Sequence, residues 1–180
     1  MLPAAALICL GAPGASGART RAGSCPGAGL SPGAANAAAV DSATLCLIDR
    51  VRAAHHLRPL RANSALQGVA ARQAACIVRW DYFADECPSG QTAAALIAAT
   101  PYGAHAARLS TGQNVGWGTG PFATPAQMVT AWMASPAHRA IILTRSFNDA
   151  GVGVTPAVPS ANAGGERGAT YAIEFAARRS

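Results

Sequence analysis

The sequence contains no lysine. All 14 basic residues are arginine, and only 12% of the 180 residues are charged. The arginines are scattered, as Arg50, Arg72 and Arg178 illustrate. A nucleic-acid-binding chain usually gathers its basic residues on one face and places aromatic residues among them. We therefore expect the formal charge of +6 to form a solvated basic surface, with no nucleic-acid partner.

The sequence also lacks an apolar run that could span a bilayer. The N-terminal stretch, residues 1–18, is apolar but short, and it ends in small residues that suit signal peptidase. We predict a cleaved export signal there, although its usual basic start is missing. A Gly/Pro/Ala-rich arm over residues 19–38 and one domain over residues 39–180 should follow. The predicted location is secreted and extracellular, without stable membrane insertion.

No pair of cysteines has the CxxC spacing of a zinc knuckle. Cys9 lies in the predicted signal, which leaves Cys25, Cys46, Cys76 and Cys87. Four cysteines in an exported domain indicate two disulfides, for which three pairings exist. The choice that joins neighbours in sequence is Cys25–Cys46 with Cys76–Cys87.

Apolar spacing and capping residues predict the helices. A helix is expected over residues 42–55, and a second should start after Asn63 and run to about Trp80, with this tryptophan on its apolar face. A short helix is expected over residues 92–99. Thr124 before a proline, followed by Gln127, predicts the start of a further helix.

The remaining segments predict strands. "LSTGQNVGWGTG" is dense in glycine and predicts a short strand or a tight loop. "AGVGVTPAV" and "TYAIEFAA" predict two antiparallel strands joined by a polar loop. Helices followed by an antiparallel pair favour an α+β class, with an α-β-α sandwich as the architecture.

His138 is the histidine whose setting is most informative. Ser135 and Pro136 repeat the cap-and-proline signal and place His138 in the first turn of a new helix. An imidazole there can bind a metal or make one fixed hydrogen bond. Its position alone does not decide between these roles.

The stretch "WMASPAHRAIIL" followed by "FNDAGVGV" resembles the signature of bacterial members of the CAP superfamily, which includes cysteine-rich secretory proteins, antigen 5 and pathogenesis-related proteins. "GQNVGWG", "ATLCLIDRVRAAHHLRPLRANSAL" and "RWDYFADECPSG" are similar to further blocks of the family in the right order. The resemblance covers residues 42–175. It implies an α-β-α sandwich with a central cleft, in the form of a bacterial SCP-like extracellular domain.

In many family members two histidines and two acidic residues line the cleft and can hold a divalent cation, usually zinc. In this sequence, the position of one of these histidines is occupied by Asp85. The glutamate of the family's Gly-Glu-Asn block is replaced by Gln113, which is followed by Asn114, and the second glutamate position is occupied by Ser135. Only His138 is kept. One imidazole, one carboxylate and one carboxamide make a poor zinc site, so we expect no metal and no other cofactor. We expect Asp85, Gln113 and His138 to hydrogen-bond one another instead.

Catalysis has little support in the sequence. Ser135, His138 and Asp85 are the residue types of a hydrolytic triad, but Ser135 is better placed to cap a helix with its hydroxyl. No G-x-S-x-G nucleophile elbow is present.

Three functions remain for a chain without an identified catalytic residue. The leading hypothesis is a secreted, non-catalytic CAP-domain protein that binds a lipid or an extracellular protein through a degenerate cleft. The alternatives are a cation-dependent hydrolase of cell-wall or protein substrate, and a purely structural envelope protein. The sequence leaves the oligomeric state open.

Overall fold

The computed structural model describes residues 24–159 and 166–179. In chain order the elements are η1 (Ala34–Asn36), α1 (Ala37–Ala54), β1 (Arg61–Ala62), α2 (Ser64–Arg79), α3 (Ala93–Ala98), β2 (Arg108–Thr119), η2 (Gly120–Ala123), α4 (Pro125–Ala134), α5 (Pro136–Ile142), β3 (Asp149–Thr155) and β4 (Gly168–Arg179). The predicted export signal and Cys9 lie outside the described residues. None of the helices in the described part combines the length and the hydropathy needed to cross a membrane.

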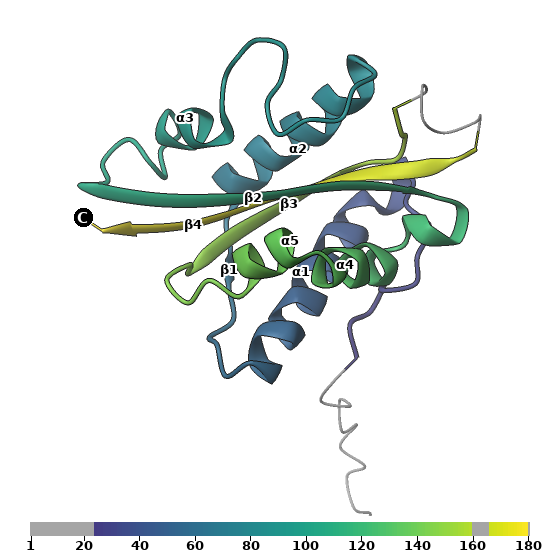
Figure 1. Cartoon of the computed structure of the whole chain (residues 1–180), viewed down its shortest axis with the longest axis horizontal. Coiled ribbons are helices and arrows are strands. Elements are labelled where there is room, and N and C mark those ends of the chain that lie inside the picture. Colours follow the sequence, from purple (N-terminus) through teal and green to yellow (C-terminus); the bar gives the residue numbers. More distant parts are fainter. Residues whose placement is uncertain (1–23, 160–165, 180) are drawn as a thin grey trace, which may run out of the picture.

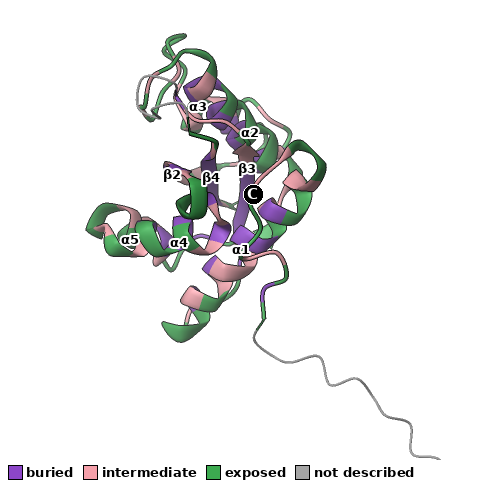
Figure 2. Ribbon diagram, turned by 90° about the vertical axis from the view of Figure 1, so that its right-hand side faces the viewer, coloured by how far each residue is buried: buried purple, intermediate pink, exposed green. Residues whose placement is uncertain are grey.

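The molecule is a three-layer sandwich. Its middle layer is a four-stranded sheet in the order β1-β3-β4-β2, in which β1 runs parallel to β3 and the other neighbours are antiparallel (Figure 1). Helices α2 and α3 cover one face, and α1, α4 and α5 cover the other (Figure 1). The buried residues lie mainly in the sheet and on the helix surfaces that face it (Figure 2). The predicted α+β sandwich is confirmed.

Local signals set the starts of the helices. The side chain of Asn63 accepts hydrogen bonds from two backbone N–H groups in the first turn of α2, and Thr124 caps α4 as predicted. Helix α1 begins at Ala37, five residues before the predicted start. Residues 37–39 are all alanine, the strongest helix former, so they extend the helix toward the arm.

β2 is a twelve-residue edge strand where the sequence predicted a short strand or a tight loop. It pairs with β4 along its whole length. A Cβ atom at Gly116 would lie 2.6 Å from the Sδ of Met128 and 3.0 Å from the Nε1 of Trp132. The glycine therefore makes room for helix α4 and does not interrupt the strand.

The structure has both disulfides of the sequence-local pairing, Cys25–Cys46 and Cys76–Cys87. The first ties the N-terminal arm to α1. The second joins α2 to the loop that follows it.

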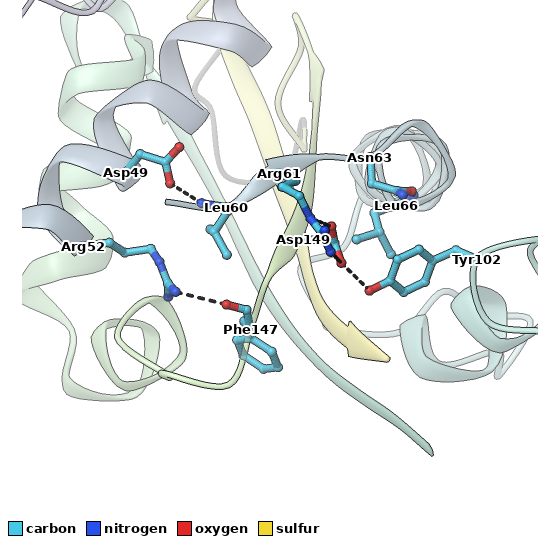
Figure 3. A network of polar contacts seen from close by, with 9 residues as sticks. All are labelled: Asp49, Arg52, Leu60, Arg61, Asn63, Leu66, Tyr102, Phe147 and Asp149. Carbon is cyan, nitrogen blue, oxygen red and sulfur yellow. Dashed lines mark hydrogen bonds and ion pairs between the residues drawn. The ribbon is translucent and has the colours of Figure 1, made fainter. Parts of the chain in front are cut away.

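Asp149, the first residue of β3, connects three segments at the edge of the sheet (Figure 3). Its carboxylate accepts from Arg61 Nε at 2.8 Å and from Arg61 Nη2 at 3.1 Å. The hydroxyl of Tyr102 donates to Oδ2 of the same carboxylate at 2.8 Å. Burial and this negatively charged neighbour raise the pKa of Tyr102 well above its usual value. The network fixes β1 and the segment after α3 against β3.

Arg52 on α1 is fully buried and has backbone carbonyls as its partners (Figure 3). Its Nε donates to Arg58 O at 3.0 Å. Nη1 donates to Ile142 O at 2.7 Å and Thr144 O at 3.1 Å, and Nη2 donates to Phe147 O at 3.1 Å. The guanidinium group thus holds the connector after α1 and the whole turn between α5 and β3.

The backbones of α2 and β3 meet at two glycines. A Cβ at Gly151 would overlap the backbone of Leu66 and Gln67, and one at Gly153 would overlap the backbone of Ala71. Backbone atoms cannot move aside as the end of a side chain can. These glycines are therefore required by the close approach of the helix to the sheet.

Replacing Arg52 by methionine should lower the free energy of unfolding by about 3 kcal/mol or more, because four carbonyl oxygens lose a charged donor. In a chain of this size that loss corresponds to a fall of roughly 6–12 °C in Tm. Calorimetry of Arg52→Met beside Arg50→Met, an exposed position on the same helix, measures it. Equal Tm values for the two variants would contradict the role given to Arg52.

Gly153→Ala should cost about 3 kcal/mol, because the new methyl group has no space between β3 and α2. Gly68→Ala is the matched control, since no atom lies within 4 Å of a Cβ at that helical position. The control should gain up to about 1 kcal/mol from better helix propensity. Denaturant unfolding of both variants tests the contrast. A Gly153→Ala protein as stable as wild type would show that the contact is looser than described.

Candidate functional site

The residues predicted for the cleft lie around β2, on two different faces of the sheet. Gln113 stands opposite Glu174 of β4, which in turn stands opposite Gly151 of β3, so these three share the face that α2 covers. Asn114 is the next residue along the strand and faces the other way. Its Nδ2 donates to the backbone carbonyl of His138 on α5 at 3.1 Å. The sheet thus lies between Gln113 and the helix that carries His138.

Gln113 is paired with a residue that the sequence analysis missed. Its Nε2 donates to Oε1 of Glu174 at 2.7 Å. Glu174 is 0% exposed, and its Oε2 has no hydrogen-bond partner among the described residues. A single acid inside the apolar strand "TYAIEFAA" was the signal that could have identified it, because a strand buried on both faces rarely carries an acid without a partner.

The setting of Glu174 favours the protonated carboxyl. Burial raises its pKa from 4.5 to about 7. The hydrogen bond from Gln113 opposes this shift, and the negative charge of Asp85 adds to it.

The expected hydrogen-bonded cluster of Asp85, Gln113 and His138 is not formed. Asp85 is exposed in the loop after α2, and Gln113 uses its amide on Glu174. Within residues 24–159 and 166–179, no hydrogen bond links the His138 ring to either residue. The physical reason is the alternation of side chains along β2, which directs Gln113 toward α2 and away from α5.

Ser135 occupies the predicted cap position but does not use its hydroxyl there. It ends α4 and precedes α5, and its backbone N–H bonds to the carbonyls of Ala131 and Trp132. No side-chain cap bond to α5 is present in the described structure. Thr124, which also precedes a proline, does form its cap bond, so Pro136 is not the reason for this difference.

In the described structure these residues are not arranged as a hydrolytic triad or as a zinc site. The described structure has no hydrogen bond between Ser135 and His138, which a serine nucleophile and its base need. In the described part of the chain, no three His, Cys, Asp or Glu residues are grouped closely enough to hold a metal ion. The donor set around His138 therefore does not fit the zinc site that the resemblance implied.

The buried carboxyl of Glu174 should make the protein less stable as the pH rises. Because its pKa is about 7 in the folded protein and 4.5 in the unfolded chain, the folded state binds the proton more tightly between these values. This contribution is greatest below pH 4.5 and is lost as the pH rises through 7, a difference of about 3 kcal/mol. Urea unfolding of wild type and Glu174→Gln from pH 4.5 to 7.5 measures it.

Glu86→Gln, at an exposed position, is the control for the change of charge. Asp41, whose pKa burial raises to about 6, contributes a slope of the same sign that remains in both variants. The Glu174→Gln protein should lose less stability than wild type across this range. Parallel curves for the two proteins would show that Glu174 is not the group responsible.

Comparisons with known proteins agree with this architecture. The model of the cysteine-rich secretory protein family, CAP, matches residues 45–162. Comparison with curated protein sequences gives no match. An outer surface protein of Borrelia burgdorferi superposes with a TM-score of 0.58 at 17% identity, over 75% of this chain and 90% of that one.

Two larger bacterial proteins share the fold. An extracellular protein of Bacillus anthracis containing an SCP domain gives a TM-score of 0.61 at 18% identity, over 79% of this chain and 41% of that one. A cysteine-rich secretory protein of Staphylococcus aureus gives 0.57 at 18% identity, over 81% of this chain and 40% of that one. This chain thus spans about two fifths of each of these proteins. The family match over residues 45–162, together with the sandwich fold, shows that the chain belongs to the CAP family of cysteine-rich secretory proteins.

Proposed function

We propose that this chain is a non-catalytic binding domain that holds a lipid or an extracellular protein outside the cell. The observation that carries the proposal is that both amides of β2 donate to groups inside the protein. Gln113 binds Glu174, and Asn114 binds the backbone of His138. The donors used in these two bonds hold the fold together and are not available to stabilise a reacting group.

The groups that remain at the surface suit contact with a ligand. Asp85 is exposed, and Ser135 and His138 are half-buried, without hydrogen bonds between their side chains in the described structure. Such groups can hydrogen-bond a ligand without first breaking an internal pair. They lack the coupled nucleophile and base that a hydrolytic step requires.

The extracellular location rests on three observations. Residues 1–18 have the pattern of an export signal. Proteins with a similar fold are described as an outer surface protein and an extracellular protein. Two disulfides in a small domain are typical of an oxidising compartment outside the cytosol.

A turnover assay separates a binding domain from a hydrolase. The full chain, with and without added Zn²⁺, should release no more product from casein or peptidoglycan than His138→Ala does. The His138→Ala protein should also unfold within about 1 kcal/mol of wild type, since the structure gives its ring no hydrogen bond among the described residues. Elemental analysis of the purified protein should find less than one zinc per chain.

Binding itself is tested by incubating the protein with a radiolabelled bacterial lipid extract and measuring the lipid retained through gel filtration. Retained, saturable lipid supports the proposal in its lipid form. Stoichiometric zinc together with hydrolysis that His138→Ala abolishes would replace it with the cation-dependent hydrolase.

A further inference from the structure

A groove with an unusual lining lies at the C-terminal end of α2, the end far from α3 (Figure 1). Its volume is about 540 Å³, within the range of small-molecule sites. It is separate from the residues predicted for the cleft. The lining consists of Arg72, Ala75, Cys76, Arg79, Trp80, Cys87, Pro88 and Ser89.

The groove is built on a rigid base. Arg72, Ala75 and Arg79 project from α2, whose backbone is packed directly against β3. The Cys76–Cys87 disulfide fixes the opposite wall, which carries Pro88, to the helix. A covalent bond between the helix and this wall limits how far they can move apart, so filling the groove should cost little conformational entropy.

Large aromatic side chains are exposed at this place, although aromatic residues make up only 6% of the sequence. Trp80 was expected on the buried face of α2, but it is the residue that ends the helix and is 56% exposed. Phe83, three residues later, is 47% exposed. Of these two exposed rings, Trp80 lines the groove, and an exposed aromatic ring on an apolar hollow is typical of a surface that binds a ligand.

The charges around the groove indicate which ligand chemistry it fits. Two guanidinium groups line it, from Arg72 and Arg79, and its described lining includes no carboxylate. The Arg79 guanidinium carbon lies 5.5 Å from the centre of the Trp80 ring, so a cation is held at the edge of the apolar surface. An anionic group at this edge would pair with the two guanidinium groups, and an attached alkyl chain would pack on the Trp80 ring and the disulfide.

The shape and the flanking charges favour a single molecule over a bilayer. A flat anionic membrane would also approach Asp85 and Glu86, which are exposed on the same loop outside the groove, and would be repelled by them. Neither carboxylate belongs to the lining that a ligand in the concave part would contact. The hollow therefore suits a single-chain ligand better than a lipid surface.

We propose that the groove between α2 and the Cys76–Cys87 loop binds a single-chain anionic amphiphile, whose alkyl chain packs on Trp80 and whose carboxylate or phosphate group pairs with Arg72 and Arg79. The proposal rests on the proposed binding function and gives it a ligand class and a place. It also assigns a role to the exposed tryptophan that the fold alone does not require.

The test uses dodecyl phosphate, below its micelle concentration, titrated into the full chain by calorimetry. One saturable site is expected. Trp80→Ala should weaken binding about tenfold or more, because the ring supplies apolar area to the alkyl chain and holds Arg79 beside the groove. Arg72→Gln combined with Arg79→Gln should weaken binding of dodecyl phosphate to the level of the uncharged dodecyl maltoside.

Phe122→Ala is the matched control, because Phe122 is 67% exposed and lies in η2, outside the groove. It should bind dodecyl phosphate as wild type does. All replaced side chains are exposed, so unchanged thermal unfolding confirms that each variant folds.

Three results would overturn the proposal: equal weakening by Trp80→Ala and Phe122→Ala, equal affinity of wild type for the charged and uncharged amphiphiles, or binding to phosphatidylglycerol vesicles without binding of monomeric dodecyl phosphate. Lipid retained from the bacterial extract by Trp80→Ala as well as by wild type would reject the groove and leave the proposed binding function standing. If the protein retains no lipid at all, both the groove proposal and the lipid form of the proposed binding function are wrong.

Discussion

The placement of α5 depends on a buried cation. A guanidinium group removed from water needs compensation, and Arg52 finds it in four carbonyl oxygens, with no carboxylate among its hydrogen-bond partners in the described structure. Ile142 ends α5, so its carbonyl lies at the negative end of that helix. One side chain of α1 therefore satisfies a helix terminus and a turn that lie about ninety residues away in sequence. This contact and the hydrogen bond from Asn114 to the carbonyl of His138 together hold α5 in place.

The parts of the structure that could be predicted are those controlled within a few residues. The side chains of Asn63 and Thr124 accept hydrogen bonds from the helices that they begin, so their capping role could be predicted without knowing the rest of the fold. The same holds for the Cys76–Cys87 pair, which closes a short loop. The final two strands were recognised because each carries a continuous apolar run, as expected for strands covered on both faces.

The candidate site was harder to predict because it depends on which face of the sheet each residue occupies. The family pattern suggested that the side chains of Asp85, Gln113 and His138 meet. Side chains alternate between the two faces of the sheet along β2, and this separates Gln113 from His138. Glu174 was missed since its partner comes from another strand. Trp80 was placed wrongly because helical spacing continues past the point where the helix ends. The glycines of β2 were read as signs of a loop. The structure shows that Gly116 is needed because side chains of α4 occupy the space where its Cβ would lie.

The contact of α2 with β3 through Gly151 and Gly153 has a consequence for kinetics. A helix seated on a strand backbone to backbone has little freedom to slide or tilt, and the disulfide at its far end restrains the loop as well. The proposed ligand at that end of the helix should therefore enter without a preceding movement of α2. Its association should proceed at a rate set by diffusion and orientation, and chemically related molecules should differ mainly in how long they stay bound.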